Sequence, residues 1–276
     1  GRIRDRMSQF HDLILPVLTL AATGAFAGLL AGLLGVGGGI VLVPAFFFVF
    51  ERAGYGGPDL MQLCLATSLA TIIVTSIRSA TAHHRKGAVD WTILRQWAAG
   101  IAIGALVGVL TVGALRTDLL QIIFAVLVVL IATYMAVSRP HWRLAETMPE
   151  GPRKWLMSPA VGFLSVLLGI GGGSLGVPLM TLHGRPIHRA VATAAGFGVL
   201  IAVPSVLAFL FMPIQNAPPL TIGSVNLLAF AVTIAMTLIT APIGAELAHR
   251  TDAGRLKRFF ALFLFLVALN MLRKAL

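Results

Sequence analysis

The stretch Gly35-Val36-Gly37-Gly38-Gly39 divides a long apolar run, and Pro44 follows five residues after its last glycine. The pattern recurs 134 residues later as Gly169-Ile170-Gly171-Gly172-Gly173, again with a proline, Pro178, five residues after the last glycine. Glycine costs a helix about 1 kcal/mol relative to alanine, and proline removes a backbone hydrogen-bond donor. We therefore expect two broken helices, one within residues 13–50 and one within residues 155–183.

The two halves of the chain repeat each other beyond these two glycine motifs (residues 35–39 and 169–173). Further matches follow in the same order: Ala66-Thr67 with Ala192-Thr193, Gly87–Asp90 with Gly223–Asn226, Arg116–Asp118 with Arg250–Asp252, and Tyr134-Met135 with Asn270-Met271. Ordered matches over the whole chain indicate an internal duplication. We divide the chain into a first transmembrane repeat, 1–140, a polar linker, 141–154, and a second transmembrane repeat, 155–276.

The composition is that of a protein embedded in lipid. Of 276 residues, 58% are hydrophobic and only 11% are charged, whereas an average soluble domain carries about 25% charged residues. A membrane helix needs roughly 20 apolar residues. Besides the two broken segments, six runs are long enough: 60–82, 92–115, 118–137, 188–212, 220–246 and 256–272. The composition excludes a soluble enzyme and predicts an all-α polytopic membrane protein, with one glycine-broken helix and three transmembrane helices in each half.

The charge and the cysteine content restrict which binding partners, metals and cofactors we expect. The net charge of +11 comes from basic residues that cluster between the apolar runs, as expected of loops held against an anionic membrane leaflet. We therefore expect contact with membrane lipid and no nucleic acid. Residues 2–11 place apolar side chains on one helical face and predict an N-terminal interfacial segment. The single cysteine, Cys64, excludes a disulfide framework and a cysteine-based metal site, and we expect no metal and no cofactor.

The broken segments leave two topologies open. If each crosses the membrane once, the halves are parallel, and the two sides carry 13 and 8 lysines and arginines. If each is a re-entrant hairpin, the halves are inverted, and the two sides carry 14 and 7. The positive-inside rule favours the inverted repeat. Residues 13–34 are long enough to span the membrane by themselves, which favours the parallel arrangement. We expect the inverted repeat.

Broken membrane helices are typical of a transporter binding site near the middle of the membrane when they occur at matching positions of two halves. The half-helix that follows each break presents free N–H groups and partial positive charge, where anions bind. We therefore expect a small anionic substrate at Gly37, Gly38, Gly39, Gly171, Gly172 and Gly173. The alternative is that these glycines serve close helix packing only, which is the role we expect for Gly24, Gly28, Gly32, Gly100, Gly104 and Gly108.

Side chains complete the expected site. Hydroxyls come from Thr67, Ser68, Ser174 and Thr193, and Arg78 would attract an anion if it faces the bundle interior. His83, His84 and Glu246 are candidates for gating or proton coupling. The alternative is that the two histidines form an interfacial basic cluster and that Glu246 is a loop acid. Asp90 and Asn226 occupy equivalent positions and are expected to cap the helices that follow them.

Together these motifs resemble the TauE/SafE family of sulfite exporters, also called toluene-sulfonate uptake permeases. The resemblance covers residues 13–275 and rests on Gly28, Gly35–Gly39, Pro44, Ala66–Ser68, Gly87–Asp90, Gly162, Gly169–Gly173, Pro178 and Ala192-Thr193. It implies a multi-pass secondary transporter of the prokaryotic inner (plasma) membrane that carries sulfite or organosulfonates, commonly outward. The second half has Ala194 in place of Ser68 and Ser174 in place of Ile40, so a site built from both halves is not symmetric.

Other functions stay open at this level. A carrier for another anion, such as a lipid phosphate head group or a carboxylate, and a passive anion channel both fit the same features. The chain contains no HExxH, GxSxG or Walker motif, so we expect no enzyme. A carrier that works against a gradient also requires a coupling proton or ion, or the membrane potential.

Overall fold

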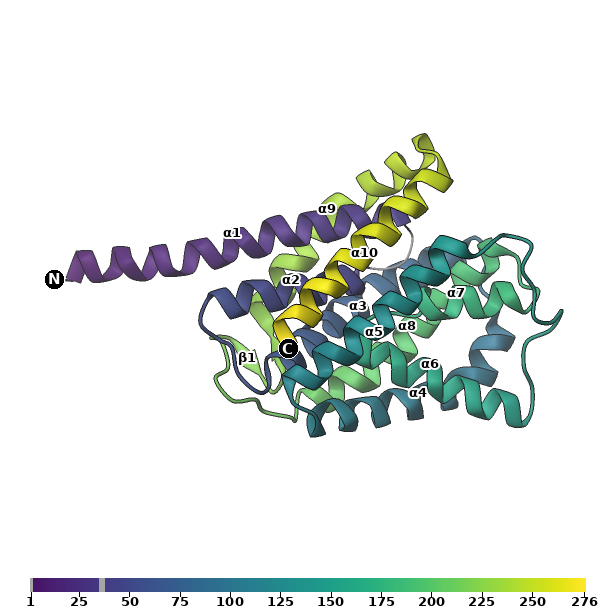
Figure 1. Cartoon of the computed structure of the whole chain (residues 1–276), viewed down its shortest axis with the longest axis horizontal. Coiled ribbons are helices and arrows are strands. Elements are labelled where there is room, and N and C mark those ends of the chain that lie inside the picture. Colours follow the sequence, from purple (N-terminus) through teal and green to yellow (C-terminus); the bar gives the residue numbers. More distant parts are fainter. Residues whose placement is uncertain (1, 35–37) are drawn as a thin grey trace.

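In the computed structural model, which describes residues 2–34 and 38–276, the chain forms helices joined by short loops and one small β-hairpin (Figure 1). The first half contains α1 (Arg2–Leu34), α2 (Gly39–Arg52), α3 (Leu60–Arg85), α4 (Trp91–Ala114) and α5 (Thr117–Val137). The second half contains α6 (Pro152–Leu168), α7 (Gly173–Leu182), α8 (Ile187–Phe209), α9 (Leu227–Arg250) and α10 (Ala253–Ala275). Each half is thus a helix pair around a glycine motif, followed by three further helices.

Among the described residues, six helices are long and apolar enough to cross a membrane. They are Ile14–Leu33 within α1, the whole of α3, α4, α5 and α8, and Leu227–Gly244 within α9. Large apolar side chains such as Leu110 and Leu130 lie on the outside of the bundle, 69% and 60% exposed, where lipid would cover them. The expected all-helical, multi-pass architecture is confirmed. The predicted run 256–272 forms α10 but is not among these six candidate spans.

The run 220–246 differs from the expectation at its start. It begins with the antiparallel strands β1 (Thr221–Ile222) and β2 (Val225–Asn226), and α9 starts only at Leu227. Gly223 takes a φ of 57° in the turn between the strands, a conformation that glycine adopts without strain. The turn and the cap at Asn226 therefore decide the boundary, although the residues around them are apolar.

The second glycine motif coincides with a helix break, as expected, and the described residues of the first motif, Gly38 and Gly39, form the start of a helix. α1 ends at Leu34 and α2 begins at Gly39, whereas α6 ends at Leu168 and α7 begins at Gly173. Gly169 takes a φ of 61° and terminates α6 in the left-handed conformation that favours glycine. After each break the chain turns back, so that α2 and α7 return toward the ends where α1 and α6 began (Figure 1). Gly37 lies outside the described residues.

The first helix of each half packs against a helix of the other half, so that the two halves exchange these helices. α1 packs along α9, and its repeat α6 packs along α4. Glycines permit both approaches, because a methyl group on Gly28 would collide with Thr240, and one on Gly162 would collide with the carbonyl oxygen of Ile101. α3 packs on its repeat α8, and α5 packs on its repeat α10. The two halves of the chain therefore form one interlocked bundle.

The connections gather at two ends of this bundle (Figure 1). We call one the hairpin end, with residues 53–59, 115–116 and 210–226, and the other the loop end, with residues 86–90, 138–151, 183–186 and 251–252. The hairpin end is held by hydrogen bonds between separate connections, such as Asn216 Nδ2 to the Gly56 carbonyl at 3.0 Å. The loop end is held by Lys257 Nζ, which donates to the Ser138 carbonyl at 2.8 Å.

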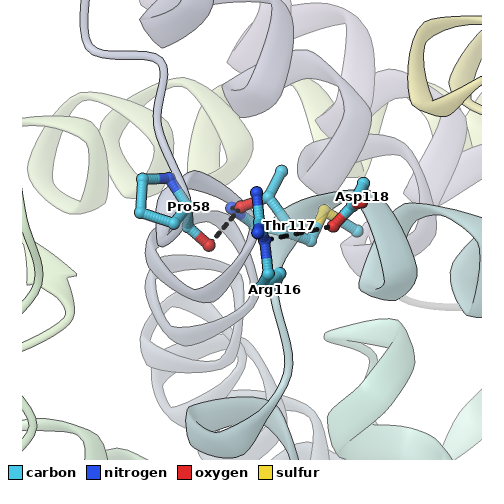
Figure 2. A network of polar contacts seen from close by, with 5 residues as sticks. Pro58, Arg116, Thr117 and Asp118 are labelled. Carbon is cyan, nitrogen blue, oxygen red and sulfur yellow. Dashed lines mark hydrogen bonds and ion pairs between the residues drawn. The ribbon is translucent and has the colours of Figure 1, made fainter.

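A further polar network at the hairpin end ties the start of α5 to the start of α3 (Figure 2). Thr117 Oγ1 donates to the carbonyl of Pro58 at 2.9 Å and accepts from the backbone N–H of Met61 at 3.1 Å. Arg116 Nε lies 3.9 Å from Asp118 Oδ1 beside it, in an exposed ion pair. One threonine hydroxyl thus fixes where two helices begin.

Candidate functional site

The two glycine motifs lie against each other. A methyl group on Gly39 would collide with the carbonyl oxygen of Gly169. Ser68 Oγ on α3 donates a hydrogen bond to the same oxygen at 2.6 Å. The first residues of α2 therefore touch the break between α6 and α7.

Next to this contact lies a cavity of about 250 Å³. Both halves line it, with the residues Ala31, Gly32, Gly38, Ile72, Thr75, Ser76, Ser79, Gly171, Gly172, Gly173, Val177, Val191, Ala194, Ala195, Thr237 and Ala241. Along α3 the lining residues run from Ile72 to Ser79, in the direction of the loop end. The cavity therefore extends from the glycine motifs toward the loop end.

No charged side chain is among these lining residues. Two helix N-termini supply positive potential instead, because Gly38 and Gly172 are the N-cap residues of α2 and α7. Neither N-cap makes a side-chain hydrogen bond, so the first amide groups of both helices lack a capping side chain. An uncapped helix N-terminus attracts anions through its N–H groups and the helix dipole.

Hydroxyl groups of α3 and α9 also line the cavity. Within the described part of the chain, the hydroxyls of Ser76, Ser79 and Thr237 make no hydrogen bond to protein, whereas Thr75 Oγ1 lies 3.3 Å from the Thr71 and Ile72 carbonyls. Sequence reasoning did not select these four. For the three hydroxyls on α3, the sequence pattern that could have identified them is the spacing 72, 75, 76, 79, which places these residues on one helical face.

Of the predicted substrate-binding residues, Gly38, Gly171, Gly172 and Gly173 line the cavity. Gly39 is buried against Gly169, and Ser174 is buried in the first turn of α7. Gly32, expected to serve packing, lines the cavity as well. Packing is confirmed for the other five glycines of that group: a methyl group on any of Gly24, Gly28, Gly100, Gly104 or Gly108 would press on a neighbouring helix.

Thr67 and Thr193 do not line the cavity but form a reciprocal pair of contacts. Thr67 Oγ1 accepts from the backbone N–H of Asn226 at 3.1 Å, and Thr193 Oγ1 accepts from that of Asp90 at 3.0 Å. Both threonines are fully buried. Each half therefore uses the same residue to hold the start of a helix in the other half.

The expected helix caps are confirmed at these same positions. Asp90 Oδ1 accepts from the N–H groups of Thr92 and Ile93 at 3.1 and 3.2 Å. Asn226 Oδ1 accepts from the N–H of Ala229 at 2.8 Å.

The charged and titratable candidates lie away from the cavity lining. Arg78 is exposed on α3, and Glu246 forms an exposed ion pair with Arg250 at 2.9 Å. His84 Nδ1 accepts from Trp91 Nε1 at 3.2 Å, and His83 is half-buried near the end of α3. Roles for these residues in binding, gating or proton coupling stay predictions.

Comparison with known proteins assigns the chain to a family. A family model described as "Sulfite exporter TauE/SafE" matches residues 20–271. A "Probable membrane transporter protein" of Haemophilus influenzae is 33% identical over 260 residues, which cover 94% of this chain and 98% of the relative. A protein of the same description from Methanocaldococcus jannaschii is 29% identical over 205 residues, covering 72% and 73%. No solved structure is significantly similar to the chain. This multi-pass membrane protein belongs to the TauE/SafE sulfite exporter family of membrane transporters.

Proposed function

We propose that this protein is a secondary transporter, not an enzyme, that carries small sulfur-containing oxyanions such as sulfite or organosulfonates outward across the membrane. The observation that carries the proposal is the cavity between the uncapped N-termini of α2 and α7. Helix dipoles and hydroxyl donors suit an anion there without the burial of a cationic side chain. Family membership supports the sulfur-containing substrate class.

Size and charge restrict the substrate further. A cavity of about 250 Å³ lies just below the range of about 300–1,000 Å³ that drug-sized ligands occupy. It has room for a sulfite or a short organosulfonate with some water. Removing water from a charge is costly, and no cation lines the cavity to compensate for a second negative charge. We therefore favour a monoanion, such as bisulfite or a sulfonate.

The proposal includes inverted halves with the loop end in the cytoplasm. α1 and its repeat α6 run in opposite directions along the bundle (Figure 1). α2 and α7 have 14 and 10 residues, about 21 and 15 Å of helix, which is too short to span. The segments 78–95, 139–154, 185–189 and 250–258 contain 14 of the 21 lysines and arginines, and the positive-inside rule assigns such segments to the cytoplasm.

This orientation makes the cavity accessible from the cytoplasm. Export then begins with an anion that enters from the loop end and binds at the glycine motifs. An inside-negative potential favours outward movement of an anion by about 2.3 kcal/mol per charge per 100 mV. The membrane potential is therefore a sufficient driving force for a monoanion, with or without a coupled proton.

The test is transport by purified protein in liposomes loaded with labelled sulfite. We expect saturable efflux that unlabelled sulfite and a short organosulfonate compete for, and that accelerates when unlabelled sulfite is added on the opposite side. Equal competition by phosphate or a carboxylate would indicate a carrier for a different anion. Flux without any such counter-transport would indicate a passive channel and would contradict the proposal.

A further inference from the structure

The internal repeat extends to individual contacts. The hydrogen bond from Asn226 to Thr67 has its counterpart in that from Asp90 to Thr193. Gly28 packs on Thr237 as Gly162 packs on Ile101. These contacts give a residue-by-residue correspondence at offsets of 134 in the broken helix pairs, 126 between α3 and α8, and 136 between α4 and α9.

The cavity itself is not repeated. Its lining residues have counterparts in the other half, such as Ser165 for Ala31, Ala202 for Ser76 and Ser205 for Ser79. Ser165 lies on α6, and the counterparts on α8, which include Ala202 and Ser205, run toward the hairpin end. Eleven of the counterparts are 0% exposed: Ser165, Val166, Ile201, Ala202, Ser205, Val43, Leu65, Ser68, Leu69, Ile101 and Ala105. The same set of positions is thus open on one side of the glycine motifs and closed on the other.

A difference in packing at two equivalent glycines accounts for this asymmetry. A methyl group on Gly172 would collide with the Ala194 carbonyl oxygen and with Phe197, because the start of α7 sits directly on α8. A methyl group on Gly38 would meet only Ala31, Leu42 and the Ala27 carbonyl, at 3.5 to 3.7 Å. The start of α2 does not press on α3, and the cavity occupies the space beside it.

An unpaired polar group marks the closed side. Ser165 is fully buried, and its Oγ has no hydrogen-bond partner among the described residues. A buried hydroxyl without a partner is unfavourable, and water or an anion would satisfy it if the surrounding helices separated. Ala31, the residue equivalent to Ser165, lines the open cavity.

We infer that the protein forms a second anion-binding cavity on the hairpin side of the glycine motifs, lined by Ser68, Ser165, Gly198, Ala202 and Ser205, when the first cavity closes. The first turn of α7 then separates from α8, and the first turn of α2 packs closely against α3, so that each half takes up the packing that the other half has here. Because the two halves share their interhelical contacts, the exchanged arrangement is built from equivalent contacts and is accessible without a new fold. The inference rests on the proposed function, since it assigns the same anion to both cavities.

Thiol accessibility tests the second cavity in a Cys64→Ala background, which removes the only cysteine. Ser165→Cys and Ser205→Cys report on the closed side, and Ser79→Cys reports on the open side. Ser158→Cys is the matched control, because Ser158 is a buried serine of α6 that packs against Gly100 rather than facing the second cavity. The probe is 2-sulfonatoethyl methanethiosulfonate, a membrane-impermeant anion, added to sealed vesicles from one side at a time.

From the hairpin side we expect Ser165→Cys and Ser205→Cys to react at least tenfold faster than Ser158→Cys. Ser79→Cys should react predominantly from the loop side. Equal reaction of Ser165→Cys, Ser205→Cys and Ser158→Cys from the hairpin side, with normal reaction of Ser79→Cys from the loop side, would overturn the inference. If one closed-side variant fails to insert, the other decides. Labelling requires no transported substrate, so hairpin-side reaction in a protein that fails to carry sulfite would refute the substrate assignment and leave the second cavity standing.

Discussion

Gly38 and Gly172 occupy the same position in the two glycine motifs and serve different purposes in this conformation. Gly38 borders the cavity with room around it, whereas Gly172 also fits against the backbone of α8. At Gly38 a side chain would enter the cavity of the proposed site, but at Gly172 it would first push two helices apart. Substitutions at these two positions can therefore separate the proposed contact with substrate from the packing of the bundle.

Gly38→Val should abolish transport in a protein that still inserts and keeps its melting temperature, because the added methyl groups fill the cavity beside α2. Gly172→Val should abolish transport and also lower stability by about 1–3 kcal/mol, the usual cost of overpacking. Sulfite efflux and thermal unfolding in detergent measure the two effects. Normal transport by both variants would refute the site at the glycine motifs.

Ser76→Ala and Ser79→Ala should raise the apparent KM for sulfite about tenfold when combined, because each removes an unpaired hydroxyl from the cavity. A tenfold change corresponds to about 1.4 kcal/mol, close to the lower end of the range of about 1.5–3 kcal/mol that one hydrogen bond to a charged group contributes. Thr111→Ala is the control, since Thr111 is half-buried on α4, does not line the cavity, and its hydroxyl donates to the Val107 carbonyl at 2.9 Å. Unchanged KM in the double variant would remove these hydroxyls from the binding site.

At the scale of elements, the exchange of helices between halves depends on a few small contacts. α1 and α9 approach through Gly28, and α6 and α4 approach through Gly162. Thr67 and Thr193 then fix the loops before α9 and α4 by accepting a backbone hydrogen bond from Asn226 and Asp90. These contacts link the halves at opposite ends of the bundle.

Thr67→Val and Thr193→Val should each destabilise the protein by about 1–3 kcal/mol, because each leaves a buried N–H without an acceptor. Thr67→Ser and Thr193→Ser keep the hydroxyl and should retain most of the stability. Thermal unfolding measures this effect, and KM for sulfite is measured in parallel. A raised KM at unchanged stability would instead support the direct substrate contact predicted from the sequence for these threonines.

At the scale of the whole molecule, the proposed topology and the proposed direction of transport depend on each other. The connections rich in lysine and arginine lie at the loop end, and the cavity extends toward that end. Inverted halves place all of these connections on one side of the membrane. Parallel halves would divide them between the two sides and would separate residue 251 from residue 147.

Single cysteines at Thr147, Gln215 and Thr251 in the Cys64→Ala background distinguish the two topologies, because all three residues are exposed. Inverted halves predict that Thr147→Cys and Thr251→Cys react with an impermeant reagent from the cytoplasm and that Gln215→Cys reacts from the opposite side. Parallel halves predict that Gln215→Cys shares the side of Thr147→Cys and that Thr251→Cys lies opposite. Labelling of inside-out and right-side-out vesicles decides between them.

The sequence alone determined the features that depend on local chemistry. Apolar runs of about 20 residues specify membrane helices wherever they occur, and the glycine motifs specify breaks because glycine is a poor helix former in any context. The capping roles of Asp90 and Asn226 follow in the same way from residues adjacent in the chain. The start of α9 at Leu227 was not predicted, because the turn at Gly223 lies within an apolar run and leaves the hydropathy of that run unchanged.

Tertiary structure alone decided which side chains reach the cavity. Thr67 and Ser76 lie on the same helix and both carry a hydroxyl, yet one meets a loop of the other half and the other faces the cavity. Their difference arises from the packing between the two halves, which depends on contacts between residues far apart in the sequence, such as Thr67 and Asn226, 159 positions apart. The open and closed sides of the glycine motifs likewise depend on how α2 and α7 seat against α3 and α8, and two repeats of one sequence pattern cannot specify which of them is open.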